Sequence, residues 1–346
     1  MEALSVEDIP HGPEWQYEPK WDGFRCLVFR DGENIDLRSK SGQPFARYFP
    51  DLVAAFARVP ARSFVLDGEI VVPHGNTLSF DDLLQRIHPA ASRVTKLAAQ
   101  TPALFIAFDL LVDAERRALV DLPHAERRRR LEAFAERQFR AVEQLRLSPS
   151  ADDLAKAERW LTAAGGALDG VVAKWRNAPY RSRDRSAMRK IKQIRSADCV
   201  VGGFRYGTDS KLVGSLLLGL YDEAHLLHHV GFTSGIKAQT REALTKRLER
   251  LIAPPGFTGK APGGPSRWST KRSSEWCPLK PKLVVEVCYD HFTGDRFRHG
   301  TRLLRWRPDK APAQCTLDQV APKRGNLLAL LDGVPAGRRR RAALAS

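Results

Sequence analysis

The sequence predicts an α+β protein of two domains followed by a short tail. The chain has 346 residues, of which 43% are hydrophobic, which is enough for two cores. Up to about residue 195, apolar strand-like runs alternate with amphipathic helical segments. Beyond Ser196 the pattern changes to short strands interrupted by one helix. We therefore expect domains at 1–195 and 196–325 and a basic, disordered tail at 326–346.

The first expected hairpin surrounds a lysine. A strand-like run ends at Lys20, Gly23 allows a tight turn, and the next strand ends in the turn signal Asp31-Gly32. At its ordinary pKa of about 10.4 the Lys20 amine is protonated and cannot attack an electrophile. Neighbouring cations, a metal or desolvation can lower that pKa. This stretch alone supports a nucleophilic Lys20 and a solvated Lys20 paired with Asp22 or Asp31 equally well.

Two later strands carry carboxylates in apolar surroundings. Asp67 and Glu69 interrupt the strand expected at 64–72, and Asp169 begins a similar pattern at 168–174. Buried strands seldom hold ionised groups without a partner, so these carboxylates indicate a site. The run at 104–111 is predicted to be a core strand.

Helices are expected between these strands. Pro50 starts a short helix at 50–56, and longer helices are predicted at 123–139 and 151–164. The second of the three contains the run Arg127 to Arg130. We interpret this run as a solvated face, because glutamates flank it at helical spacing.

The segment after Tyr180 is strongly basic. Lys190 and Lys192 flank Ile191, so on a strand both amines face the same side. Two like charges repel unless an anion lies between them, and a phosphate would satisfy both.

The second domain is predicted to be a small barrel of the OB kind. Short strands are expected at 199–205, 215–221, 225–232 and 283–289, with a helix at 240–252. Such barrels often bind nucleic acid. His225, His228 and His229 lack metal-ligand spacing, so we expect structural or solvent-facing roles for them.

Charge and composition narrow the class of protein. A net charge of +16 favours a polyanionic partner such as nucleic acid. No apolar run approaches the roughly 18 residues of a membrane-spanning helix, so we expect no membrane attachment. Five cysteines without CxxC spacing indicate neither a disulfide framework nor a zinc knuckle, and a reducing cytoplasm is the expected location.

The ordered motifs resemble a known enzyme family. A Lys-x-Asp-Gly-x-Arg, the carboxylate strands, a dibasic strand and a late Arg-x-Asp-Lys occur in the order typical of covalent nucleotidyltransferases, which include polynucleotide ligases and mRNA capping enzymes. Over roughly residues 15–315, the sequence looks most like small bacterial ATP-dependent DNA ligases of the LigC type and the ligase module of LigD. The resemblance implies an adenylation domain with antiparallel sheets and flanking helices, followed by an OB-fold domain.

The resemblance also implies a nucleotide site. Lys20 would attack the α-phosphate of ATP and become lysyl-AMP, and Phe108 would stack on adenine. Glu18 is at the position where proteins of this family contact the edge of adenine. Arg25 is at the position where they hold ribose or phosphate. Lys174, at the end of its strand, is a further expected nucleotide contact.

Metal and phosphate ligands follow from the same resemblance. Glu69 and Asp169 match the positions that serve Mg²⁺, with Mn²⁺ as an alternative; the family usually has Glu where this chain has the shorter Asp169. Lys190 and Lys192 match the pair on the α-phosphate. The late motif, which acts on the pyrophosphate leaving group, corresponds to Arg307, Asp309 and Lys310.

The implied substrate is nicked double-stranded DNA. Asp22 would arrange the reacting nick and Arg38 would hold its 5′-phosphate, with further DNA contacts expected from Arg181, Arg183 and Lys211. The implied function is an ATP-dependent DNA ligase in DNA repair. We expect a monomer, because nothing in the sequence suggests an oligomer interface, and protein partners are unknown. A capping guanylyltransferase, an RNA-strand ligase and a catalytically inactive nucleic-acid-binding protein remain as alternatives.

Overall fold

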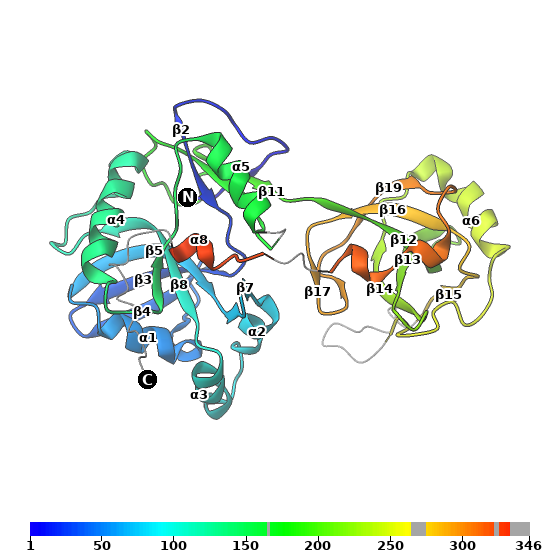
Figure 1. Cartoon of the computed structure of the whole chain (residues 1–346), viewed down its shortest axis with the longest axis horizontal. Helices are drawn as coiled ribbons and strands as arrows, with labels where there is room; N and C mark the ends of the chain where they lie inside the picture. Colours follow the sequence, from blue (N-terminus) through cyan, green and yellow to red (C-terminus); the bar gives the residue numbers. More distant parts are fainter. Residues whose placement is uncertain (165–166, 264–274, 322–324, 333–346) are drawn as a thin grey trace, which may run out of the picture. The chain divides into compact units, whose positions relative to one another are not determined.

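The chain folds into two compact units (Figure 1). The computed structural model describes residues 1–164, 167–263, 275–321 and 325–332. Unit 1 comprises residues 1–193 together with the C-terminal residues from 322, and unit 2 comprises residues 194–321. Residues 333–346, most of the expected tail, lie outside the described residues.

Unit 1 contains two main sheets. The first has the order β1-β11-β10-β2, formed by β1 (Leu4–Ser5), β11 (Met188–Lys192), β10 (Gly170–Trp175) and β2 (Trp15–Pro19). The second has the order β4-β3-β5-β8-β9, formed by β4 (Asn34–Ser39), β3 (Phe24–Asp31), β5 (Ser63–Val71), β8 (Leu104–Val112) and β9 (Leu145–Leu147). A small hairpin joins β6 (Pro73–His74) to β7 (Thr77–Leu78). The pairs β1–β11 and β8–β9 are parallel, and the other pairs are antiparallel.

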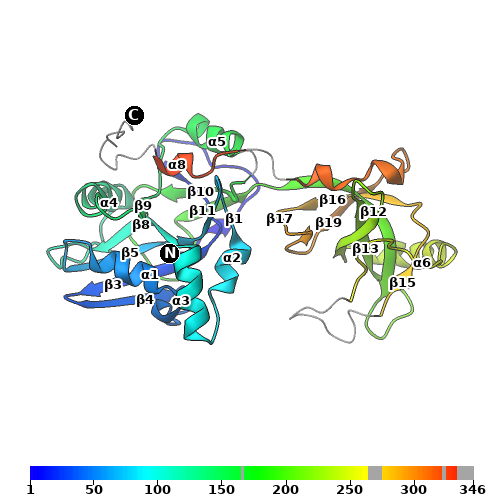
Figure 2. The same cartoon turned by 60° about the horizontal axis from the view of Figure 1, so that its bottom comes forward.

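Helices flank these sheets, as the sequence predicts. They are α1 (Pro50–Ala57), α2 (Phe80–Gln85), α3 (Ala91–Gln100), α4 (His124–Gln138), α5 (Leu154–Ala163) and α8 (Ala329–Asp332), with a 3₁₀ turn at Ala46–Tyr48. Two begin with side-chain caps: Ser79 accepts a hydrogen bond from the Asp82 backbone, and Asp153 accepts one from the Ala155 backbone. Figure 2 shows α4 beside β8 and β9, and α8 lies near α5 in the same hydrophobic cluster. The predicted helices at 50–56, 123–139 and 151–164 are therefore present, whereas α2 and α3 were not predicted.

The interpretation of Arg127 to Arg130 as a solvated face is wrong for the first two residues. Arg127 is fully buried and holds Asp109 through two bonds of 2.9 Å. Arg128 is also buried and donates to the Ser148 carbonyl at 2.7 Å. Burial of these guanidiniums is tolerated because charged or carbonyl oxygens face them. Arg129 and Arg130 pair with Glu126 nearer the surface.

Unit 2 is built on one larger sheet with the order β14-β13-β12-β16-β19, and β15 also pairs with β12. Its strands are β12 (Arg195–Tyr206), β13 (Val213–Tyr221), β14 (Leu227–Thr233), β15 (Cys277–Pro278), β16 (Val284–Tyr289) and β19 (Arg302–Trp306), with a separate hairpin of β17 (Phe292–Thr293) and β18 (Arg296–Phe297). Helix α6 spans Arg241–Glu249, and 3₁₀ turns lie at Ala238–Thr240, Pro312–Gln314 and Leu317–Gln319. The strand set and single longer helix agree with an OB-type domain.

A closed barrel is not formed by the described residues of unit 2. The end of β14 and the residue before β19 meet through one isolated bridge, Thr233–Thr301, rather than a ladder. The Thr233 hydroxyl donates to the Thr301 carbonyl at 3.0 Å, and the Thr301 hydroxyl donates to the Phe232 carbonyl at 3.1 Å. The edges therefore touch at one point, and the sheet remains open in its strand order.

No helix in the described part of the chain is both long and apolar enough to cross a membrane.

Candidate active site

A cavity of about 460 Å³ opens in unit 1. Its volume is within the range of small-molecule sites. Both main sheets contribute to its wall, together with the N-terminal residues 2–5. The predicted site residues that line it are Glu18, Lys20, Arg25, Glu69, Phe108, Lys174 and Lys190. Glu18 and Lys190, which are 172 positions apart in the sequence, thus line the same cavity.

Lys20 follows β2 and is fixed by its backbone. Its amide N–H donates to the Gly170 carbonyl at 2.9 Å, which extends the β2–β10 pairing by one residue. The side chain is about one-fifth exposed and forms an ion pair with Asp169, whose side chain is almost completely buried. Asp22 and Asp31 are the partners considered from the sequence; the structure shows an ion pair with Asp169, and the charge of Asp22 also acts on Lys20. Lys20 is therefore positioned by the fold.

The surroundings of Lys20 shift its pKa downward, towards the neutral, nucleophilic form. Burial lowers the pKa of the Lys20 amine, and the charges of Lys192 and Lys190 act in the same direction, whereas Glu69 and Asp22 oppose them. Lys190 and Lys192 lie on β11 opposite Val172 and Gly170 of β10. The alternation seen in the sequence thus brings both amines to the Lys20 side of the sheet.

Arg25 is held by Asp67 of the neighbouring strand. Its Nε and Nη2 donate to the two carboxylate oxygens at 3.0 and 2.6 Å. The Tyr180 hydroxyl donates to the same carboxylate at 2.8 Å, and Arg25 Nη1 donates to the Met1 carbonyl at 2.6 Å. Asp67 is fully buried. The guanidinium is thereby oriented at the cavity wall.

Glu69 lies directly opposite Arg25 in the β3–β5 pairing. Burial raises the pKa of Glu69 to about 8, although Lys20 and Arg25 act to lower it. Two carboxylates, Glu69 and Asp169, therefore both lie close to the Lys20 amine. Hard carboxylate oxygens are the donors that Mg²⁺ and Mn²⁺ prefer, so this donor set fits such an ion.

Phe108 forms an aromatic wall with cations around it. Lys174 Nζ lies 4.8 Å from the ring centroid, and the Arg25 guanidinium carbon lies 5.8 Å from it. Lys174 also donates to Glu18 at 2.7 Å and to the Phe108 carbonyl at 3.2 Å. Arg128 contacts the same Glu18 oxygen at 3.4 Å. The Glu18 carboxylate is thus neutralised within the wall by two cations.

The N-terminal segment covers one side of the cavity. Strand β1 pairs with β11, and Glu2 forms ion pairs with Lys40 at 3.1 Å and Arg185 at 3.0 Å. Lys40 and Arg185 both line the cavity. The sequence does not predict these contacts, because nothing in the composition of residues 1–5 indicates a strand.

The expected DNA contacts lie outside this cavity. Arg38 is exposed on β4 and pairs with Asp36 at 2.6 Å. Arg181 is also exposed and pairs with Asp121 at 2.7 Å, and Arg183 is an exposed neighbour. Lys211 is exposed in the turn between β12 and β13 of unit 2. Asp22 is half-buried two residues after the cavity lysine.

The late basic motif forms a cluster in unit 2. Arg307 binds Asp198 of β12 through Nη1 at 2.9 and 3.1 Å, and it binds Asp309 at 2.8 Å. Lys310 donates to the same Asp198 carboxylate at 2.7 Å. One buried carboxylate therefore holds both cations of the motif.

Several residues of these networks had no assigned role from sequence. Asp67 is a carboxylate in an apolar strand, which is the sequence signal that marks it as a candidate site residue. Tyr180, Arg128 and Asp198 carried none, because their partners are distant in sequence: 113 residues separate Tyr180 from Asp67.

Comparison with known proteins gives the family. Residues 3–192 match the family described as "ATP dependent DNA ligase domain", and residues 209–310 match "ATP dependent DNA ligase C terminal region". The chain is 44% identical over 338 residues to the protein named DNA ligase C2 of Mycolicibacterium smegmatis, covering 92% of this chain and 93% of that protein.

Two further similarities are more distant. The chain is 29% identical to the multifunctional non-homologous end joining DNA repair protein LigD of Mycobacterium tuberculosis, over 87% of this chain and 37% of that protein. A solved structure described as "DNA binding with a minimal scaffold: Structure-function analysis of Lig E DNA ligases" matches with a TM-score of 0.54 and 17% identity, covering 89% of this chain and 100% of that one. The second match shows the shared fold alone.

Proposed function

The chain belongs to the ATP-dependent DNA ligase family, and from this premise we propose that it seals nicks in duplex DNA, joining a 3′-hydroxyl to a 5′-phosphate with ATP as co-substrate. The observation that carries the proposal is the position of Lys20. Its amine lies in a cavity of nucleotide size, with a lowered pKa, beside two carboxylates and two further lysines.

In the first step, the Lys20 amine attacks the α-phosphorus of ATP. A nitrogen–phosphorus bond forms, the bond to the β-phosphate oxygen breaks, and pyrophosphate leaves. Negative charge develops on the phosphate oxygens, so the positions of cations govern the rate. Positive charge is supplied by Lys190 and Lys192 from one main sheet and by the Arg25 guanidinium from the other. Lys20 must also lose its proton, which burial promotes.

The adenosine moiety is assigned to the wall formed by Phe108. The half-buried ring offers a face for stacking on the base. Glu18 and Lys174 close the wall around it through their 2.7 Å ion pair. Arg25 and Glu69 face each other across β3 and β5, where they would contact ribose and phosphate.

A divalent ion is assigned to Glu69 and Asp169. Its charge, when bound, would stabilise the phosphate oxygens of ATP during attack. Asp169 now contacts Lys20. Asp169 would hold the ion together with Glu69. Mg²⁺ suits these ligands, and Mn²⁺ is a suitable substitute.

Two transfers follow adenylylation. A 5′-phosphate oxygen of DNA attacks the lysyl-AMP phosphorus, and the amine of Lys20 leaves. The 3′-hydroxyl then attacks the activated 5′-phosphate, and AMP leaves as the phosphodiester forms. We assign Asp22 to the arrangement of the nick and Arg38 to its 5′-phosphate.

Arg307, Asp309 and Lys310 are assigned to the departure of pyrophosphate. They lie in unit 2, whereas the lysine lies in unit 1. We assign their action to adenylylation, the first step.

DNA is expected to bind through phosphates. Arg181, Arg183 and Lys211 are exposed, and a chain of net charge +16 attracts a polyanion. The repair function in the name of the LigD relative supports a role in DNA repair here. We further propose that the protein acts as a monomer in the cytoplasm.

The test is sealing of a labelled nicked duplex by the purified protein with Mg²⁺ and either ATP or GTP. We expect joined product with ATP, none with GTP and none with Lys20→Ala. Lys156→Ala, a change at an exposed lysine of α5, is the matched control and should seal normally. GTP-dependent labelling of the protein without sealing would indicate a capping enzyme, and DNA binding without either reaction would indicate a binding protein.

A further inference from the structure

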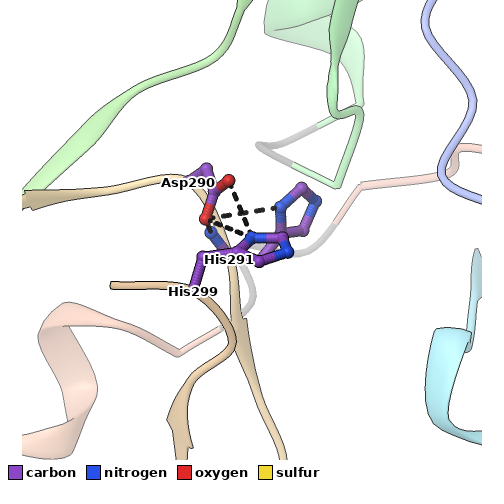
Figure 3. Close-up of side chains that lie close together, drawn as sticks. All are labelled: Asp290, His291 and His299. Carbon is purple, nitrogen blue, oxygen red and sulfur yellow. Dashed lines mark hydrogen bonds and ion pairs between the residues drawn. The ribbon is translucent and has the colours of Figure 1, made fainter. Parts of the chain in front are cut away.

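Three side chains of metal-ligating type, none of which is assigned to ligation, converge in unit 2. Asp290, His291 and His299 each direct one donor atom to a common point, and these three atoms lie within 4.8 Å of one another (Figure 3). His299 Nδ1 is 2.9 and 3.0 Å from the two Asp290 oxygens, and His291 Nδ1 is 4.0 Å from one of them.

The fold creates this convergence through a hairpin. Asp290 and His291 follow the end of β16, and β17 and β18 then reverse the chain, with Phe292 opposite Phe297. Gly294 adopts a φ of +64° in the turn, where glycine is favoured. After the hairpin, the Arg298 amide donates to the His291 carbonyl at 3.0 Å. His299 is the next residue, so it is returned to the side of Asp290.

Aromatic packing holds the hairpin against the core of unit 2. The Phe297 ring is buried and lies 4.8 Å from the Tyr289 ring and 5.3 Å from the Phe292 ring, measured between centroids. Tyr289 immediately precedes Asp290. The three donors therefore project from segments that are fixed by packing, which is the condition for a preorganised metal site.

The donor set selects a class of ion. Two imidazole nitrogens and one carboxylate oxygen suit borderline ions such as Zn²⁺, whereas Mg²⁺ and Ca²⁺ prefer oxygen ligands alone. Zinc bonds of about 2.0–2.1 Å place neighbouring ligand atoms roughly 3.3 Å apart in a tetrahedron. The Asp290–His299 distances are already close to this value, whereas His291 Nδ1, 4.0 Å from Asp290, has to move closer for zinc to bind.

We propose that Asp290, His291 and His299 bind one Zn²⁺-class ion with three protein ligands and a fourth position open to water. The ion would join the end of β16 to the residues after β18 and so fasten the hairpin. Two Asp–His ion pairs without a metal are the simpler interpretation, because Asp290 lies near both imidazoles and also accepts from the His291 amide at 2.8 Å. The two rings lie edge to face, at 85° with centroids 6.5 Å apart. The titration below distinguishes the two interpretations.

The chain offers a matched control in the same unit. His228 pairs with Asp222 at 2.8 Å, as His299 pairs with Asp290. The other ring nitrogen of His228 accepts from the Lys260 amide at 3.1 Å. This His–Asp pair has no third His, Cys, Asp or Glu ligand near it among the described residues.

The test is calorimetric titration of the full chain, freed of metal by chelator and dialysis, with zinc chloride. We expect one saturable site per chain and at least a tenfold weaker affinity in both His299→Asn and Asp290→Asn. His228→Asn should bind as the unsubstituted protein does. Bound Co²⁺ should show no thiolate charge-transfer absorption, which separates this site from binding by the five cysteines.

Melting temperatures show whether a substitution changes folding rather than zinc binding. His299 is half exposed, so metal-free His299→Asn should melt at the temperature of the unsubstituted protein. Added zinc should raise the melting temperature of the unsubstituted protein and not that of the variant. No saturable binding, or equal affinities in His299→Asn and the unsubstituted protein, would overturn the proposal. Neither readout depends on ligase activity.

Discussion

The Arg25 guanidinium and the Asp67 carboxylate form a two-bond ion pair across neighbouring strands, with bonds of 3.0 and 2.6 Å. Asp67 is fully buried, and the Tyr180 hydroxyl donates to it at 2.8 Å. Paired bonds of this kind fix the plane of a guanidinium as well as its position. The cavity therefore presents Arg25 in a set orientation before any nucleotide binds.

Tyr180→Phe should lower the rate of adenylylation by roughly threefold to tenfold, because loss of one bond to Asp67 loosens Arg25. The loss corresponds to about 1 kcal/mol, as for one hydrogen bond. The stopped-flow or quench rate of AMP incorporation measures this effect. Melting of the variant close to the unsubstituted protein would exclude general unfolding, and an unchanged rate would contradict the positioning role.

Phe108→Ala should raise the KM for ATP in adenylylation by roughly 10- to 100-fold. Stacking of a base on an aromatic ring contributes about 1–3 kcal/mol. Phe108→Tyr keeps the aromatic face and is the matched control, for which we expect a KM within about threefold of the original. Equal effects of the two substitutions would refute stacking on this ring.

Asp198→Asn should reduce adenylylation more than it reduces sealing of a pre-adenylylated nick. Its carboxylate contacts both Arg307 and Lys310, the cations assigned to pyrophosphate departure. Substitution of Asp309 or Lys310 should give the same division between steps.

Glu286→Gln is the control for Asp198→Asn, because Glu286 lies opposite Asp198 in the β12–β16 pairing and pairs with Arg305 at 2.6 Å. It should leave both steps near normal. Equal losses in both assays for Asp198→Asn would contradict the assignment of the cluster to the first step.

Nick sealing at subsaturating DNA should fall steeply with salt concentration. Phosphate contacts by Arg38, Arg181, Arg183 and Lys211 release counterions, so the logarithm of affinity should decline linearly with the logarithm of salt, with a slope corresponding to several ions. Duplexes of different sequence should give the same slope. A flat response up to physiological salt would show that these residues do not hold DNA.

Local sequence patterns were sufficient to predict much of the fold. Alternation placed Lys190 and Lys192 on one face, and the apolar run with two carboxylates correctly identified β5. The buried Arg127 was misjudged because its position in a run of four arginines resembles a solvated face, while its partner Asp109 lies on another element. Helix periodicity does not show which side of a helix meets a distant carboxylate.

The contacts that orient the cavity residues could not be predicted either, because they join residues far apart in the sequence. Asp169 was expected to bind metal, yet its contact with Lys20 joins residues 149 positions apart. Tyr180 and Asp198 act through similar long-range bonds. A small barrel of the OB kind was expected from short strands interrupted by one helix, whereas closure of such a barrel depends on the pairing of β14 with β19, which here is one bridge at Thr233–Thr301.

The most direct test of the central claim is the intact mass of the purified protein before and after incubation with ATP and Mg²⁺, compared with Lys20→Ala. If Lys20 is the nucleophile, one AMP is added, the adduct survives denaturation, and the variant shows none. An adduct that persists in Lys20→Ala would show that another residue is the nucleophile. Protein that already carries AMP can be stripped of it with pyrophosphate before the incubation. If the unsubstituted protein then shows no adduct with ATP, covalent catalysis by this chain is contradicted.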